Sequence, residues 1–215
     1  MLAVFDCDGT LIDGQAAICD AMERAFANFA LPAPDRNTVR RAVGLSLPVA
    51  LRRLLPEADA GLHRDLVEAY KQHFRASREA GTLSQPLFDG LRDVLDALRT
   101  AGWQLGIATG MSQRGLVHCL ASHGLTDHFV TLQTADNHPS KPHPAMLEAA
   151  LFEATTQPQE AVMIGDTAYD MVMAVDSGVR AVGVAWGYHT PDELLAAGAE
   201  IVAADPAELR EILLR

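Results

Sequence analysis

Acidic residues follow two apolar runs of the chain, at the points where the runs end. Asp6 and Asp8 come directly after the run at residues 2–5, and Asp166 follows the run at residues 161–164. A buried carboxylate is costly unless a cation or hydrogen bonds compensate it. Three carboxylates brought together repel one another, and a divalent cation would relieve that repulsion. Oxygen ligands with no paired cysteine or histidine nearby favour Mg²⁺ over zinc.

The segment at residues 6–11 places Asp6 and Asp8 on one side of an extended chain. Gly9 then permits a sharp turn or a close approach of the backbone to a ligand. Asp8 can therefore face whatever group Asp6 attacks. A nucleophile beside an acid/base group is the arrangement that phosphoryl transfer through a carboxylate requires. A simpler interpretation is that these acidic residues only cap helices or form turns.

Three further polar residues are candidates for the same site. Thr109 ends the apolar run at residues 105–108, and Lys141 lies among prolines that stiffen its backbone. Such a lysine can act as a fixed charge on phosphate oxygens and on the nucleophile. Asp170 lies one helical turn after Asp166, so both would face one side of a helix. The simpler interpretations are a helix N-cap for Thr109, a surface lysine for Lys141 and a solvated helix residue for Asp170.

Four apolar runs have the length and composition of buried strands in a parallel sheet. They cover residues 2–5, 105–108, 161–164 and 181–184, with a weaker fifth at 129–132. Helical patterns separate the later runs. This alternation predicts an α/β fold, a Rossmann-like parallel sheet with helices on both faces. Ligands of such sheets bind outside the carboxyl ends of the strands, where Asp6, Thr109 and Asp166 fall.

Residues 14–84 break this alternation and contain no strand-like run. Apolar residues recur at helical spacing from Ile18 to Phe29 and from Leu62 to Phe74, and the stretch between them is also helical in pattern on each side of Gly44. We therefore predict an all-helical cap domain over residues 14–84, inserted after the first strand. Residues 1–13 and 85–215 would form the α/β catalytic core.

The composition indicates a globular protein with an acidic surface. Hydrophobic residues make up 49% of the 215 residues, and 28 acidic against 17 basic residues give a formal net charge of −11. Such a charge repels nucleic acid and anionic membranes, so neither is an expected partner. No apolar run approaches the roughly 20 residues of a membrane span. Three cysteines without paired spacing fit a reducing compartment, which predicts a cytoplasmic protein.

Taken together, the motifs resemble those of the haloacid dehalogenase superfamily, in its phosphatase branch with a helical cap after the first strand. Four motifs occur in order and span nearly the whole chain. They are Asp6-x-Asp8-Gly9-Thr10, Thr109 after its strand, Lys141 before Pro142, and Gly165-Asp166-Thr167-Ala168-Tyr169-Asp170. The resemblance implies a Mg²⁺-dependent phosphoric monoester hydrolase, similar to phosphoglycolate phosphatases.

The resemblance implies a role for each matched acidic residue. Asp6 would be the nucleophile and a ligand of Mg²⁺. Asp8 would be the general acid and base, and its backbone carbonyl would bind the same ion. Asp166 would bind the ion directly, whereas Asp170 would bind it directly or through water.

The resemblance also implies where a substrate would lie. Thr109, Gly110 and Lys141 would hold the phosphoryl group, and Lys141 would also assist catalysis. The leaving group of a small phosphorylated metabolite would face the cap. The cap residues that are candidates for specificity are Arg41, Gly44 and Ser46. Neither the identity of the metabolite nor the oligomeric state follows from the sequence.

Two departures from the family pattern bear on the reaction. Many relatives have Asn-Lys after the second motif, whereas this chain has Gly110-Met111. In sugar-phosphate mutases an arginine usually follows the cap-loop serine, and here Leu47 follows Ser46. A mutase is therefore a weaker alternative than a phosphatase. A dehalogenase of the same superfamily is a further alternative, although that branch works without the aspartate found here at Asp8.

Two alternatives come from other classes of protein. A signalling receiver that is phosphorylated on aspartate also combines an acidic cluster with a threonine and a lysine, but it is shorter and lacks the helical insertion. An inactive binding protein on the same fold is the other alternative, since a fold does not guarantee an activity. Turnover of a generic aryl phosphate separates an enzyme from both.

Overall fold

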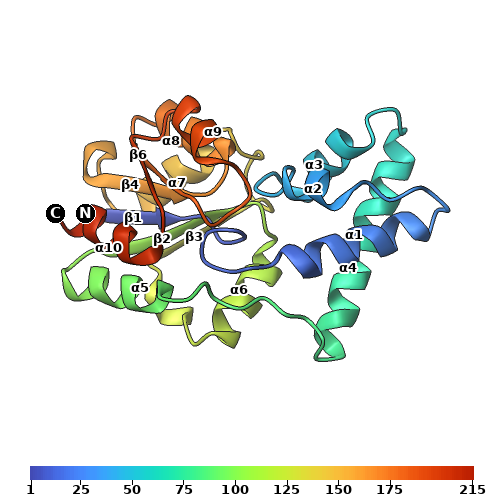
Figure 1. Cartoon of the computed structure of the whole chain (residues 1–215), viewed down its shortest axis with the longest axis horizontal. Helices are drawn as coiled ribbons and strands as arrows, with labels where there is room; N and C mark the ends of the chain where they lie inside the picture. Colours follow the sequence, from blue (N-terminus) through green and yellow to red (C-terminus); the bar gives the residue numbers. More distant parts are fainter.

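Two lobes make up the molecule, whose computed structural model describes residues 1–215. One lobe holds a sheet and both chain ends, and the other is built of helices alone (Figure 1). The strands are β1 (Leu2–Phe5), β2 (Gln104–Thr109), β3 (Thr131–Thr134), β4 (Ala161–Gly165), β5 (Arg180–Val184) and β6 (Ile201–Ala203). They pair in the order β3-β2-β1-β4-β5-β6, and every pair is parallel. The predicted α/β fold is confirmed.

Helices cover both faces of the sheet. Those on one face are α5 (Leu91–Thr100), α6 (Gln113–Ser122) and α10 (Pro206–Leu214). Those on the other face are α7 (Ala145–Glu153), α8 (Ala168–Asp176) and α9 (Pro191–Ala196). In the central strand β1, Ala3 and Phe5 pack on the first layer, and Leu2 and Val4 pack on the second. A strand buried on both faces is a continuous apolar run, which is why the sequence pattern identifies it.

The two outer strands differ from the prediction. The weak strand predicted at 129–132 begins two residues later in the structure, at Thr131. Phe129 instead follows a short 3₁₀ turn and packs into the first core layer. The strand itself is polar, since the Gln133 side chain donates a 2.7 Å hydrogen bond to the Thr131 hydroxyl. β6 is missing from the prediction because its apolar strand is only three residues long, and its first two residues are only partly buried.

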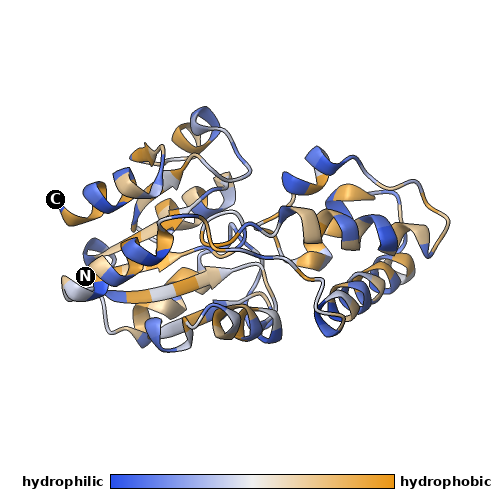
Figure 2. Cartoon of the chain, turned by 60° about the horizontal axis from the view of Figure 1, so that its bottom comes forward, coloured by the Kyte–Doolittle hydropathy of each residue, from blue (hydrophilic) through white to orange (hydrophobic).

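The second lobe consists of four helices. They are α1 (Gln15–Ala27), α2 (Arg36–Arg40), α3 (Leu47–Leu54) and α4 (Ala60–Glu79). Their apolar side chains, among them Phe26, Leu51 and Leu66, form a core that contains no residue of the sheet lobe. Figure 2 shows this lobe standing apart from the sheet and joined to it through loops at the strand ends. A separate core supports the proposed division into a cap of residues 14–84 and a sheet domain of residues 1–13 and 85–215.

The longest helix is α4, with 20 residues, and only Leu66, Val67 and Ala69 along it are buried. Leu62, Tyr70 and Phe74 are partly buried against the same core, as expected of a helix that packs one apolar stripe against a small core. Neither α4 nor any other helix combines the length and apolar character that a membrane crossing requires.

Candidate active site

The acidic residues predicted for the site lie at the carboxyl ends of the central strands. β1 runs between β2 and β4, with Phe5 level with Ile107 and Ile164. Asp6 after β1 and Asp166 after β4 therefore emerge side by side. Ligands of open α/β sheets bind at this edge.

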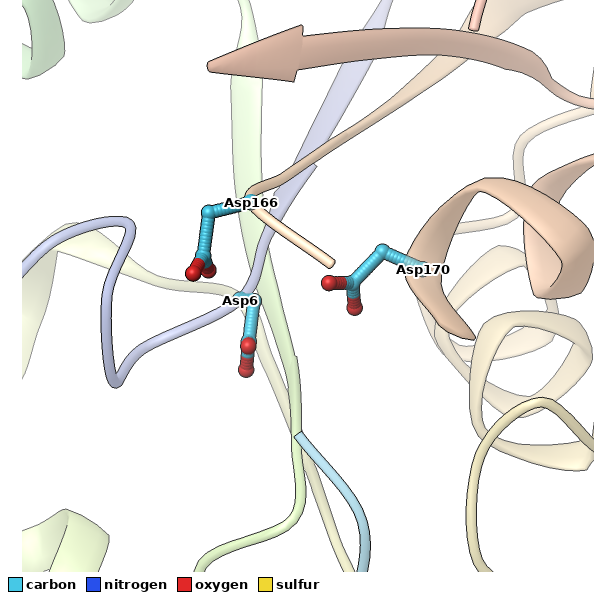
Figure 3. Close-up of side chains that lie close together, drawn as sticks. All are labelled: Asp6, Asp166 and Asp170. Atoms are coloured by element: carbon cyan, nitrogen blue, oxygen red, sulfur yellow. The ribbon is translucent and has the colours of Figure 1, made fainter. Parts of the chain in front are cut away.

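Three carboxylates converge there. Asp6, Asp166 and Asp170 each place one oxygen within 4.8 Å of the others, and all three residues are buried. Figure 3 shows Asp6 and Asp166 extending from neighbouring strand ends, with Asp170 pointing toward them from the first turn of α8. Three buried carboxylates repel one another when ionised, so the cluster requires positive charge.

One positive charge is Lys141, whose side chain is fully buried. Its Nζ donates a 2.6 Å hydrogen bond to Asp170 Oδ1 and lies 2.9 Å from Asp6 Oδ1 as an ion pair. Burial alone would lower the pKa of Lys141, but the carboxylates of Asp170 and Asp6 outweigh burial and raise that pKa. Lys141 is therefore a fixed buried charge and not a surface lysine.

Asp170 is held from two sides. Its Oδ2 accepts hydrogen bonds from the Thr167 amide (3.1 Å) and hydroxyl (2.7 Å), an arrangement that also caps α8. Its Oδ1 accepts the hydrogen bond from Lys141. A side chain at Gly165 would collide with Asp170, so glycine is needed at the end of β4. The burial of Asp170 excludes the interpretation as a solvated helix residue.

Asp166 is held by two loops that come from distant parts of the chain. Its Oδ1 accepts a 2.8 Å hydrogen bond from the Thr10 hydroxyl, and its Oδ2 accepts a 2.9 Å hydrogen bond from the Tyr188 amide. A Cβ at Gly9 or Gly187 would collide with the Asp166 carboxylate, so both loops need glycine where they approach it. No sequence signal beyond their place after β5 points to Gly187 and Tyr188.

Asp6 is the least satisfied of the three carboxylates. Both of its oxygens are buried, and its Oδ1 contacts Lys141 Nζ at 2.9 Å as an ion pair, whereas Asp166 and Asp170 each accept hydrogen bonds from two other groups. Burial raises the pKa of Asp6 to about 6, against the opposing charge of Lys141. Burial, and then the charges of Asp6 and Asp170, raise the pKa of Asp166 well above its usual range. An all-oxygen cluster that resists ionisation fits a hard divalent cation such as Mg²⁺.

Asp8 lies beside this cluster, but its carboxylate is not one of the three that converge. The third carboxylate of the cluster is that of Asp170. The cluster therefore differs in one member from the three acidic residues that follow the apolar runs, Asp6, Asp8 and Asp166. Asp8 Oδ1 is buried without a hydrogen-bond partner. Burial, and then the charge of Asp6, raise the pKa of Asp8 to about 7. A carboxyl group with such a pKa can give and take a proton near neutral pH.

The cap loop predicted to matter for specificity touches the core beside Thr109. A Cβ at Gly110 would lie 2.6 Å from the Leu45 carbonyl oxygen and 2.8 Å from that of Gly44, so only glycine allows this approach. The Ser46 amide donates a 2.8 Å hydrogen bond to the Ser140 hydroxyl, next to Lys141 in the chain. Thr109 itself is buried and is not the N-cap of α6, because Ser112 fills that position.

Arg41 lies at a different contact between the lobes. Its guanidinium pairs with Glu193 of α9, and its carbonyl oxygen accepts a 3.0 Å hydrogen bond from the Tyr169 hydroxyl. Arg53 donates to the same hydroxyl. Arg41 is therefore part of the junction between cap and core, and it does not line the cleft described next.

A cleft of about 440 Å³ lies between the two lobes. Its core side includes Asp6, Asp8, Thr109 and Gly110, and its cap side includes Gly44 and Ser46. Lys141, Asp166 and Asp170 support the site but are not part of the lining. Three arginines that sequence reasoning missed also line the cleft: Arg75, Arg78 and Arg114.

Comparison with known proteins places the chain in a family. The model of the haloacid dehalogenase-like hydrolases matches residues 3–184. The chain is 33% identical over 207 residues to the "Probable phosphatase IndB" of Dickeya dadantii, across 94% of this chain and 88% of that protein. It is 27% identical over 221 residues to a phosphoglycolate phosphatase of Vibrio vulnificus, across 99% of this chain and 96% of that protein. The chain therefore belongs to the haloacid dehalogenase-like hydrolase family, as its motifs predicted.

Other similarities bear on fold and on the range of activities. A crystal structure described as a predicted phosphatase from Clostridium acetobutylicum superposes with a TM-score of 0.90 at 24% identity, across 99% of this chain and 97% of that one. The "Tyrosine-protein kinase PtkA" of Mycobacterium tuberculosis is 30% identical over 215 residues, across 99% of this chain and 72% of that protein. The predicted class of phosphoric monoester hydrolase agrees with the names of the phosphatase relatives. The kinase name shows that a chain of similar sequence can be named for a different activity.

The role of Lys141 in the carboxylate cluster can be tested by unfolding. Lys141→Met removes the only basic side chain paired with Asp6 and Asp170, so ionised carboxylates would remain buried without it. We expect the free energy of unfolding in chelator to fall by about 3–5 kcal/mol, the usual loss when one partner of a buried ion pair is removed. Mg²⁺ should restore part of this loss, because an ion bound to the folded state stabilises it. Urea titrations with EDTA and with Mg²⁺ measure both effects.

The matched control is Lys71→Met, which removes a lysine from an exposed pair with Glu68. Its effect should stay within about 0.5 kcal/mol, as for most surface substitutions. A Lys141→Met protein that was as stable in EDTA as the control variant would show that the cluster needs no internal cation.

Proposed function

We propose that the chain is a Mg²⁺-dependent phosphatase of small phosphate monoesters, with Asp6 as the covalent nucleophile. The observation that carries this proposal is the position of Asp6, a buried carboxylate that lines the cleft beside the buried charge of Lys141. Its Oδ1 lies 2.9 Å from Lys141 Nζ, and Asp8 stands two residues further along the chain. Membership of the hydrolase family and the names of the phosphatase relatives support the proposal.

In the first step, an oxygen of Asp6 forms a bond to phosphorus, and the bond from phosphorus to the leaving oxygen breaks. Asp8 donates its proton to that leaving oxygen, so that the product is a neutral alcohol and not an alkoxide. The step leaves an aspartyl phosphate at Asp6 and an ionised carboxylate at Asp8. The raised pKa of Asp8, about 7, keeps a share of this group protonated at neutral pH for that purpose.

In the second step, water replaces Asp6 on phosphorus. The ionised Asp8 takes a proton from the water molecule while the water oxygen forms a bond to phosphorus. The bond between phosphorus and the Asp6 oxygen breaks, which frees the carboxylate and releases inorganic phosphate. Asp8 is then protonated again, and the site is ready for another substrate.

Charge builds up on the phosphoryl oxygens in both steps. Lys141, held by Asp170, contributes a fixed positive charge beside the nucleophile. The proposed phosphate contacts are Thr109 and Gly110, at the end of β2 and on the lining of the cleft. Mg²⁺ would be held by Asp6, Asp166, Asp170 and the Asp8 carbonyl, and when bound it would neutralise part of the phosphoryl charge.

The cap is proposed to recognise the leaving group. Gly44 and Ser46 line the cleft opposite Asp6, whereas Arg41 holds the cap to Glu193 of the core. We therefore assign Gly44 and Ser46 to contact with the substrate and Arg41 to cap closure. The relatives named phosphoglycolate phosphatases support a small phosphorylated metabolite as substrate.

Magnesium dependence and the identity of the nucleophile are tested together with p-nitrophenyl phosphate. Excess EDTA should abolish turnover and added Mg²⁺ should restore it, because the carboxylate cluster would lose its cation. Asp6→Asn should remove turnover to background, since an amide is a poor nucleophile and a weak ligand. Release of inorganic phosphate into water separates a phosphatase from a kinase or mutase, which would pass the group to another acceptor. Full turnover of p-nitrophenyl phosphate in excess EDTA would contradict the proposed Mg²⁺ dependence.

The acid role of Asp8 predicts a difference between two kinds of leaving group. An alkoxide needs a proton in order to leave, whereas p-nitrophenolate leaves with less help. Asp8→Ala should therefore slow single-turnover phosphorylation by an alkyl phosphate by about 10²–10⁴-fold, and by p-nitrophenyl phosphate much less. Asp20→Asn, on the exposed face of α1, is the matched control and should leave both rates unchanged. Equal losses on both substrates would mean that Asp8 does not protonate the leaving group.

A further inference from the structure

The cleft between the lobes is larger than a phosphoryl group needs. Its volume of about 440 Å³ falls in the range of sites that enclose a whole small molecule, about 300–1,000 Å³. Apolar side chains of α1 and α4, among them Ile18, Met22 and Phe74, form part of its cap wall. A substrate that fills this space has a leaving group that extends beyond Asp6 and Asp8.

Three arginines line the same cleft from both lobes. Arg75 and Arg78 come from the last turns of α4 in the cap, and Arg114 comes from the first turn of α6 in the core. None of the three forms an ion pair with a carboxylate, although the chain has an excess of 11 acidic groups over basic ones. The acidic residue on the lining beside α6, Asp136, already accepts a 2.8 Å hydrogen bond from the Gln113 amide.

Arg78 is the central member of this cluster. Its Nε is buried and has no hydrogen-bond partner in the protein. Burial lowers the pKa of Arg78, and the positive charges of Arg114 and Arg75 lower it further. An unpaired buried N–H costs free energy that a bound acceptor recovers. The cluster is therefore a place where like charges from two lobes meet and no carboxylate of the protein pairs with them.

We infer that Arg75, Arg78 and Arg114 form a second anion site in the cleft, and that the substrates are phosphate monoesters whose leaving group carries another anionic group. This inference rests on the proposed function, because Asp6 in the same cleft receives the first phosphoryl group. A carboxylate and a phosphate share the chemistry that the guanidinium groups recognise. An anion bound between α4 and α6 also joins the cap to the core, so the correct substrate holds the cleft closed.

The test compares three aryl esters: phenyl phosphate, 4-carboxyphenyl phosphate and 4-(phosphonomethyl)phenyl phosphate. They share one leaving atom and differ in the second charge. In the native protein, kcat/KM should be higher for the two anionic esters. Arg78→Gln should lower kcat/KM for them by about tenfold more than for phenyl phosphate, the worth of one charge-assisted hydrogen bond. Arg114→Gln, at an exposed position, should lower kcat/KM for the two anionic esters about two- to fivefold more than for phenyl phosphate. The anionic ester whose kcat/KM falls more shows whether the site prefers a carboxylate or a phosphate-like group.

Arg64→Gln is the matched control, because it removes the same charge from α4 outside the cleft. It should leave all three values unchanged. If Arg78→Gln and Arg114→Gln lower kcat/KM by the same factor for all three esters, the inference is wrong while the phosphatase proposal stands. If native protein with Mg²⁺ hydrolyses none of the esters, the phosphatase proposal fails. Calorimetric binding of benzylphosphonate and 4-carboxybenzylphosphonate to the same variants then still decides the inference, since a real site binds the second compound more tightly only when the arginines are present.

Discussion

The balance of buried charge at the carboxyl end of the sheet is the constraint on which the site depends. Asp6, Asp166 and Asp170 bring three negative charges when ionised, and Lys141 brings one positive charge, so the set carries a net charge of −2. Burial opposes such a charge, as the raised pKa values of Asp6 and Asp166 show. A divalent cation would neutralise the set. The same ion would leave Asp6 charged and able to attack phosphorus.

The fold serves this balance by bringing backbone close to the carboxylates. The loop after β1 and the loop after β5 both reach Asp166 through glycines, Gly9 and Gly187, where a side chain would collide with the carboxylate. The cap reaches the same region through Gly44, which touches the core beside Gly110. In the proposed reaction, substrate recognition and chemistry are divided between two lobes that meet at glycines. A cap with its own core can move as a unit while the carboxylate cluster stays fixed.

The sequence predicted those parts of the structure that depend on local pattern. Strands buried on both faces are continuous apolar runs, so the sequence locates β1, β2, β4 and β5. The polar residues at the ends of β1, β2 and β4 mark the site. The edge strand β3 is polar, and the apolar run of β6 is too short to stand out. The spacing of one helical turn places Asp170 near Asp166, as the sequence predicts. The pairing of Asp170 with Lys141 depends on how α8 packs, and the cleft arginines come together only when α4 meets α6. Contacts between distant segments of this kind leave no signal in the spacing of residues.

The central claim is that a phosphoryl group passes through Asp6, and trapping the acyl phosphate tests it most directly. Substrate, Mg²⁺ and the Asp8→Asn protein, in which the second step should be slow, are quenched and reduced with borohydride. Reduction converts an aspartyl phosphate to homoserine, which mass spectrometry of the N-terminal peptide can locate. We predict homoserine at position 6 only, and none without substrate. Homoserine at the position of another aspartate would contradict the account. Phosphate release by native protein with no homoserine in either the native or the Asp8→Asn protein would also contradict it.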